Sequence, residues 1–325
     1  MLTDFVVQLF DDQPRRETAV YMLLNGKKTL SVLFAALQHG QLQWLQLYPT
    51  LAREDFQAAV AQLIQAGALR QADKGLVLAD PAAQARAAVK VPLPVHYQPW
   101  MGLAGFEQRF LLAVQAVSEA SYHEARYRPA VRDWGVQQAI RRWYRQAARA
   151  DFPGELTAAF AALPAPAADR LASRLIGHDF VGSAQPLDLA GQLQKLDDLA
   201  QLVTLIAAHP EWPALTSLWG GRVQLLSPSN YRACQLIEQG QTRAQVASQL
   251  RLKASTVNEH LLAATIFGWQ PPVAALYSPA LLAAFAGVNG QEQDYQKLLA
   301  ALPGAEFFHV RLFQILNLQG RWPHA

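Results

Sequence analysis

The chain has 325 residues, of which 51% are hydrophobic and 16% charged, which is enough apolar mass for two or three folded modules and too little charge for wholesale disorder. Its one cysteine, Cys234, excludes an internal disulfide framework and any metal site built from several cysteines. The formal net charge of +3 identifies no partner, and no apolar run reaches the roughly 18–20 residues that a membrane span needs.

The N-terminal residues carry acids where a signal peptide would carry bases. Asp4, Asp11 and Asp12 lie early in the chain, and the apolar core of a signal peptide is missing. Together with the low cysteine content, this start predicts a cytoplasmic protein in a reducing compartment.

The first 80 residues predict three helices followed by a short hairpin, within a chain whose abundant Ala, Leu and Gln favour an all-α, mainly helical fold. Phe56, Val60 and Leu63 recur at helical spacing, and Gly67 can end their helix. This order is that of a winged helix, so we predict a winged-helix-like N-terminal module over residues 1–80. The expected helices cover residues 29–38, 41–48 and 53–66, and the hairpin covers residues 68–78.

The third of these helices begins with acids. Glu54 and Asp55 favour the positive end of the helix dipole but would repel a phosphate backbone. We therefore expect the N-terminal module to dock a protein or to pack within the chain, with DNA contact as the alternative.

Residues 81–99 predict a linker, because Pro92 and Pro94 break any continuous helix there. Beyond it, hydrophobic periodicity predicts a helical middle domain over residues 96–225. Its expected helices cover residues 106–120, 136–150, 167–176 and 187–208.

Residues 121–150 within this domain concentrate positive charge among aromatic side chains. Single-strand binding uses such a mixture, in which aromatic rings stack on bases and arginines neutralise phosphates. A solvated arginine face with buried aromatic rings is the equal alternative. The predicted secondary nucleic-acid patch comprises Arg126, Arg128, Arg132, Arg141, Arg142 and Arg145, with Arg149 also in the segment; the interleaved aromatic residues are Tyr122, Tyr127, Trp134, Trp143 and Tyr144.

Residues 226–325 predict a helix-turn-helix domain followed by helices that close the structure. Ser229 and Thr242 can cap its first two helices, and Gly240 can end the first. Ala247 supplies the small residue that two steeply crossed helices need where they approach most closely. The expected helices cover residues 230–239, 243–250 and 255–264.

A short turn over residues 251–253 would project the third helix outward, where its N-terminal half can enter a major groove. Asn258 can pair with adenine, while Arg251 and Lys253 lie where phosphates would pass. Trihelical units also serve as structural or protein-docking modules, and that alternative remains open. The predicted DNA-binding residues are Arg243, Arg251, Lys253, Ser255, Thr256, Asn258, Glu259 and His260.

The strings at residues 234–240 (CQLIEQG), 246–247 and 252–261 (LKASTVNEHL) resemble the helix-turn-helix domain of YpbB-like proteins, which also occurs at the C-terminus of some RecQ-type DNA helicases. Residues 20–29 and 109–118 are similar to other parts of YpbB-like proteins. The resemblance implies a bacterial protein, often encoded beside a RecQ-type helicase, with an accessory role in DNA repair or recombination. The chain has no helicase ATPase core, and its turn at residues 251–253 is less basic than the family's.

No catalytic, cofactor or metal site is expected. Gly26, Lys27, Lys28 and Thr29 are similar to the end of a phosphate-binding loop, but that motif needs glycine where Tyr21 stands and Ser or Thr where Lys28 stands. The histidines lack metal-ligand spacing, and no Ser/His/Asp set or carboxylate pair stands out.

The sequence therefore predicts a binding protein and not an enzyme. The favoured function is DNA binding as an accessory to a RecQ-type helicase. A transcriptional regulator of duplex DNA and a protein–protein adaptor that binds no DNA are the alternatives.

Overall fold

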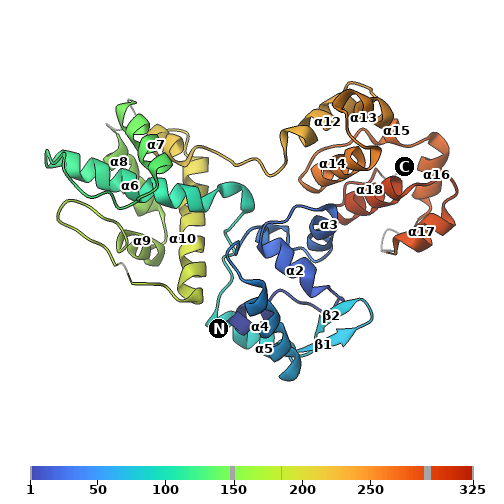
Figure 1. The fold of residues 1–325 in the computed structure, drawn as a ribbon, viewed down its shortest axis with the longest axis horizontal. Helices are drawn as coiled ribbons and strands as arrows, with labels where there is room; N and C mark the ends of the chain where they lie inside the picture. The colour runs from blue at the N-terminus through green and yellow to red at the C-terminus, as the bar shows by residue number, and fades with distance from the viewer. Residues whose placement is uncertain (1, 147–150, 184, 289–293, 324–325) are drawn as a thin grey trace. The chain divides into compact units, whose positions relative to one another are not determined.

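The computed structural model describes residues 2–146, 151–183, 185–288 and 294–323. Within these ranges the chain is mainly helical, and its only sheet has the two strands β1 and β2 (Figure 1). This confirms the predicted all-α character. Across the described residues, no helix is both long enough and apolar enough to cross a membrane.

Contacts between residues divide the chain into two compact units. The first unit comprises Met1–Asp12, Ala52–Ala72 and Leu76–Val223. The second unit comprises Gln13–Leu51, Asp73–Gly75 and Gln224–Ala325.

The N-terminal part of the first unit contains three helices and the hairpin. Asp80 caps α5 by accepting a hydrogen bond from the Ala82 N–H at 2.9 Å, and Pro81 occupies the first turn, where a proline fits. Residues 81–90 are therefore helical and not part of the predicted linker, because the helix-breaking Pro92 and Pro94 follow its end. The elements are α1 (Leu2–Val7), α4 (Arg53–Gln65), β1 (Leu69–Ala72), β2 (Gly75–Leu78) and α5 (Pro81–Lys90).

The rest of the first unit is a helical bundle around α6 and α10. Phe106, Phe110 and Ala113 form the buried face of α6, and Leu202 and Val203 lie on that of α10. The elements are η2 (Pro99–Met101), α6 (Leu103–Ser121), α7 (Trp134–Arg145), α8 (Phe152–Ala162), α9 (Ala165–Ala172), α10 (Leu189–Ala208) and α11 (Pro213–Trp219).

Buried carboxylates fasten the helices of this bundle. Glu155 on α8 is 6% exposed and accepts the backbone N–H groups of Ala214 and Leu215 at 3.1 and 2.8 Å, which satisfies the N-terminus of α11. Asp198 on α10 is 1% exposed and accepts two hydrogen bonds from the Arg170 guanidinium of α9, at 2.8 and 2.7 Å.

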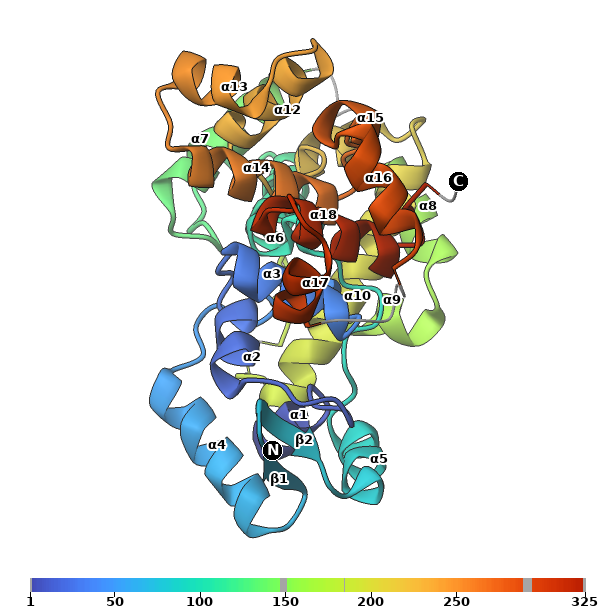
Figure 2. The same ribbon diagram turned by 90° about the vertical axis from the view of Figure 1, so that its right-hand side faces the viewer.

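The second unit is built around α14, which packs on α12, α13, α3 and α18, as Figure 1 and Figure 2 show. From Leu261 to Ile266 the side chains of α14 are buried on every side, as expected of a central helix. The elements are α2 (Glu17–Leu24), α3 (Leu30–Gln38), η1 (Leu42–Trp44), α12 (Pro228–Glu238), α13 (Arg243–Leu250), α14 (Ala254–Ile266), α15 (Val273–Leu276), α16 (Pro279–Ala286), α17 (Tyr295–Ala301) and α18 (Phe307–Leu318).

Residues 13–51 belong to the second unit, whereas local element order predicts one module over residues 1–80. The apolar face of α3, with Val32, Leu33 and Phe34 buried, covers α14 and α18. The Arg311 guanidinium of α18 stacks on the Phe34 ring at 3.6 Å from its centroid. Long-range burial against α14 and α18 thus makes α3 part of the second unit.

Candidate nucleic-acid interface

The helices α12, α13 and α14 form a three-helix unit whose ends have local causes. Thr242 and Gln245 make a capping box, in which Gln245 Oε1 accepts the Thr242 N–H at 2.8 Å. Gly240 has a φ of 84°, which suits the turn after α12. The predicted cap of α12 is wrong by two residues: Ser227 caps it, since Pro228 fits the first helical turn.

The turn between α13 and α14 presents the N-terminal end of α14. Arg251 adopts the left-handed conformation at a φ of 55°, and the Leu252 N–H returns to the Ala247 carbonyl at 2.9 Å. No side chain caps the first turn of α14, whose N-cap residue is Lys253. Its amide groups and positive dipole end therefore face outward beside two cationic side chains.

Four of the predicted DNA-binding residues are exposed around this turn, and Thr256 is half-buried beside them. Within the described part of the chain, the side chains of Arg251 and Lys253 make neither a hydrogen bond nor an ion pair. The exposed residues are Arg251, Lys253, Ser255 and Glu259.

Arg243, also predicted to contact DNA, is turned toward the protein. Its guanidinium donates to Asn258 Oδ1 at 2.9 Å and to Glu306 Oε2 at 3.1 Å, and it stacks 4.3 Å from the centre of the Phe308 ring. Arg243 thereby joins α13, α14 and α18. Asn258 is half-buried and its Oδ1 accepts this hydrogen bond, so pairing with adenine would require the contact with Arg243 to be exchanged; its role in reading adenine stays a prediction.

His260, also predicted to contact DNA, is half-buried against α12. Its Nε2 atom lies 3.1 Å from Ser229 Oγ, and its carbonyl accepts the Asn230 side-chain amide at 3.3 Å. Burial lowers the pKa of His260, which disfavours the imidazolium form that a phosphate would attract. Helical periodicity predicts that Val257 and Leu261 are buried. It does not predict that α12 covers the polar side chain of His260.

In the Arg-rich segment the aromatic side chains are divided between the core and the surface. Trp143 is buried and donates to the Ala214 carbonyl at 3.2 Å and to Ser217 Oγ at 3.1 Å, so this ring belongs to the core. Trp134 and Tyr122 are 65% and 60% exposed. Arg149 lies outside the described residues. The six arginines of the predicted patch are all exposed: Arg126, Arg128, Arg132, Arg141, Arg142 and Arg145.

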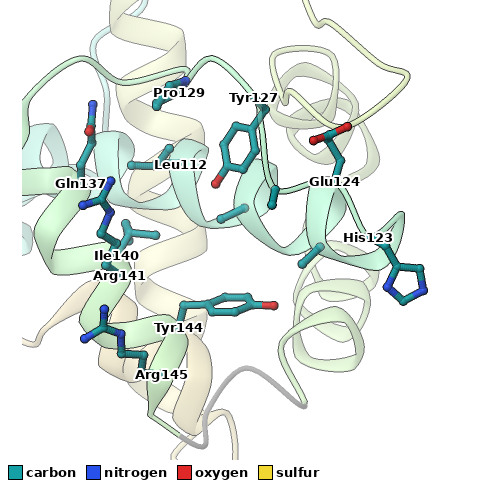
Figure 3. Close-up of a pocket in the computed structure, with 13 residues that line it drawn as sticks. Leu112, His123, Glu124, Tyr127, Pro129, Gln137, Ile140, Arg141, Tyr144 and Arg145 are labelled. Atoms are coloured by element: carbon teal, nitrogen blue, oxygen red, sulfur yellow. The ribbon is translucent and has the colours of Figure 1, made fainter.

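A cavity of about 570 Å³ opens beside this face, between α6, α7 and the loop that joins them (Figure 3). Leu112, Ala116 and Ala120 recur every four residues along one face of α6 and form its floor. Tyr127 from the loop and Tyr144 from α7 flank that floor. Sequence reasoning missed this cavity, although two alanines spaced along an otherwise bulky helix face were a signal for it.

The loop over this cavity is anchored to α6. Gln115 is 4% exposed, donates to the Arg128 carbonyl at 3.1 Å and accepts the Ala130 N–H at 2.7 Å. Burial, followed by the negative charge of Glu119, raises the pKa of Tyr127. The Tyr127 phenol therefore stays neutral and can donate a hydrogen bond into the cavity.

A second contact fastens the segment that follows α9 to the end of α6. His178 Nδ1 lies 2.7 Å from Glu119 Oε2, and the His178 ring stacks on Tyr122 with 4.5 Å between centroids. The hydrogen bond to Glu119, followed by the charge of Asp179, raises the pKa of His178 above its ordinary value of 6.5.

This contact predicts a pH-dependent stability. Because the pKa of His178 is raised in the folded state, its contribution is fully present below pH 6.5 and is lost as pH rises through the folded-state value. Urea unfolding across this range should show wild type losing its advantage over His178→Gln as pH increases. In a Glu119→Gln background the same comparison should be much shallower, because the hydrogen bond to Glu119 is the largest cause of the shift and only the charges of Asp179 and Glu124 remain; an undiminished pH dependence there would refute the assignment.

The described residues contain no group of three or more His, Cys, Asp or Glu side chains that could hold a metal ion. Lys27 and Lys28 lie exposed between α2 and α3. Cys234 is buried, which raises the pKa of its thiol to about 12.

Comparison of the chain with protein-family models, curated proteins and solved structures finds no match. The YpbB-like resemblance and the link to RecQ-type helicases remain predictions.

Proposed function

We propose that this protein binds DNA through the N-terminal end of α14, in the manner of a helix-turn-helix. The observation that carries the proposal is the exposed turn at residues 251–253. There, the Arg251 and Lys253 side chains flank an uncapped helix N-terminus, and Ser255 is exposed in its first turn. Cations and helix N-termini both favour contact with phosphate oxygens.

The orientation of α14 favours recognition of DNA structure over recognition of an operator sequence. Asn258 is held by Arg243 and His260 faces α12, so few side chains remain to read base edges. Backbone contacts position a protein on DNA but carry no sequence information directly. This supports a helicase-accessory role more than that of a sequence-specific regulator.

The proposed partner is a RecQ-type helicase in DNA repair or recombination, as the family resemblance implies. Helix α4 and the hairpin β1–β2 are the part of the predicted winged-helix-like module that suits docking to a protein. Glu54 and Asp55 are exposed at the start of α4 and would repel a phosphate backbone.

The double variant Arg251→Glu/Lys253→Glu tests this proposal. We expect affinity for forked and duplex DNA to fall by about tenfold or more, since two phosphate contacts are lost and two acids are introduced. The dependence of log K on log salt should become shallower by about 2. Fluorescence anisotropy titrations at several salt concentrations measure both quantities.

The matched control is Lys27→Glu/Lys28→Glu, which makes the same charge change on an exposed loop of the same unit. This variant should bind DNA nearly as wild type does. Equal losses in the two double variants would mean that general charge, and not α14, carries the binding. Wild type that binds no DNA but captures a purified RecQ-type helicase would favour the adaptor alternative.

A further inference from the structure

We propose that the cavity between α6 and α7 holds a nucleobase together with its attached phosphate. The base can belong to a single strand or to a free nucleotide, because the recognising chemistry is the same. This inference rests on the proposed function only in taking DNA as the natural source of the base. It concerns the first unit and does not depend on α14.

The size and floor of the cavity suit a flat ring. Its volume of about 570 Å³ lies within the range of roughly 300–1,000 Å³ that is usual for small-molecule sites. Leu112, Ala116 and Ala120 give an apolar floor, and the two alanines leave room above α6 that larger side chains would fill. A planar base can lie on this apolar floor.

Two tyrosines supply the stacking surfaces. Tyr127 and Tyr144 are both half-buried, and both rings lie at the cavity in Figure 3. Base–aromatic stacking is tolerant of sequence because every base has a π-face. The Tyr127 position is stable before a ligand arrives, since Gln115 anchors the loop at Arg128 and Ala130.

Groups of opposite charge lie on two sides of the cavity rim, one suited to a phosphate and the other to a base. Arg141 and Arg145 line the cavity from successive turns of α7 and can hold a phosphate. Glu124 lies toward the opposite side in Figure 3; its Oε1 accepts the backbone N–H of Arg126, and its second carboxylate oxygen can accept an N–H of a base. A lone polyphosphate would meet that negative charge without benefit, so the set of groups fits a nucleotide better.

Arg142 and Arg132 belong to the same exposed basic face but do not line the cavity. Variants of the two pairs can therefore distinguish binding in the cavity from a general effect of positive charge. The cavity pair Arg141→Gln/Arg145→Gln and the matched pair Arg132→Gln/Arg142→Gln remove equal charge. A third variant, Ala116→Leu, fills the floor without changing any charge.

The probes are a short fluorescent oligo(dA), followed by anisotropy, and unlabelled dAMP as competitor. We expect the cavity pair and Ala116→Leu each to weaken oligo(dA) binding by about tenfold, and the matched pair to weaken it by no more than about threefold. Displacement by dAMP would identify a free nucleotide as a sufficient ligand; no displacement, with the same pattern of variants, would identify the strand. Circular dichroism and thermal midpoints report whether each variant is folded.

Equal losses from the cavity pair and the matched pair would overturn the inference, as would a wild-type protein that binds neither probe. The α14 variant Arg251→Glu/Lys253→Glu should keep its oligo(dA) affinity. If oligo(dA) binding instead depends on α14 and not on the cavity, this inference fails while the proposed function stands. If duplex binding is absent but oligo(dA) binding follows the cavity variants, the proposed function fails and the cavity site stands.

Discussion

Replacing Glu155 with alanine is expected to lower the free energy of unfolding by about 3 kcal/mol, because hydrogen bonds to a charged group each contribute roughly 1.5–3 kcal/mol. The buried carboxylate accepts two backbone N–H groups, those of Ala214 and Leu215, and alanine would leave both unsatisfied in the core. Trp143 of α7 donates to the Ala214 carbonyl, so the loss should spread to the helix that walls the cavity. Urea unfolding followed by circular dichroism measures the change.

Two further variants test whether the loss comes from the hydrogen bonds that Glu155 accepts. Glu155→Gln keeps one carbonyl oxygen but turns an amide N–H toward the second backbone donor, so we expect roughly half of the loss. Asp169→Ala removes an exposed carboxylate from α9 and should change stability by less than about 0.5 kcal/mol. A Glu155→Ala protein as stable as the Asp169→Ala protein would show that Glu155 does not hold the N-terminus of α11.

The elements that could be predicted from the sequence are those with local causes. The capping box of Thr242 and Gln245 depends on residues three positions apart, and Gly240 ends α12 through its own backbone freedom. The helices α12, α13 and α14 therefore lie close to their predicted residues. The same local reasoning placed the cap of α12 at Ser229, whereas Ser227 caps the helix and Pro228 lies in its first turn.

Side-chain orientation on α14 could not be predicted, because the groups that decide it are distant in the sequence. Asn258 is held by Arg243, fifteen residues away, and His260 meets Ser229, thirty-one residues away. A helical pattern separates buried from unburied positions, but it does not distinguish a side chain open to solvent from one that contacts a neighbouring helix.

The cavity could not be predicted for the same reason, because it depends on contacts between residues that are distant in the sequence. The Arg-rich segment was recognisable from composition, but the cavity beside it exists only because α6 supplies a floor of small side chains. Its loop is held by Gln115, a buried amide of α6 whose partners Arg128 and Ala130 lie beyond the end of that helix. The division into units is a similar case, since residues 13–51 join α14 and α18 through the buried face of α3 and the stacking of Arg311 on Phe34, both of which are distant in the sequence.

Replacing Arg243 with alanine is expected to destabilise the protein by about 2–3 kcal/mol, the sum of two charge-assisted hydrogen bonds and a cation–π contact that are partly open to solvent. The guanidinium bonds to Asn258 and Glu306 and stacks on Phe308, which ties α14 to its neighbours. Arg243→Lys should lose most of this stabilisation as well, because a single ammonium cannot reproduce the planar fork. Urea unfolding of both variants measures these losses.

DNA titrations of the same variants decide whether Arg243 also contacts phosphate. A phosphate contact needs mainly the positive charge, so Arg243→Lys would then bind DNA as wild type does, with an unchanged salt dependence. If Arg243 instead acts by holding α14 in place, Arg243→Lys and Arg243→Ala should weaken DNA binding by similar factors. The exposed neighbour gives the opposite expectation: Arg251→Gln should alter stability by less than about 0.5 kcal/mol while reducing the salt dependence by about 1. If the Arg243 variants lose stability and Arg251→Gln loses only salt dependence, then Arg243 holds the interface in place and Arg251 contacts phosphate.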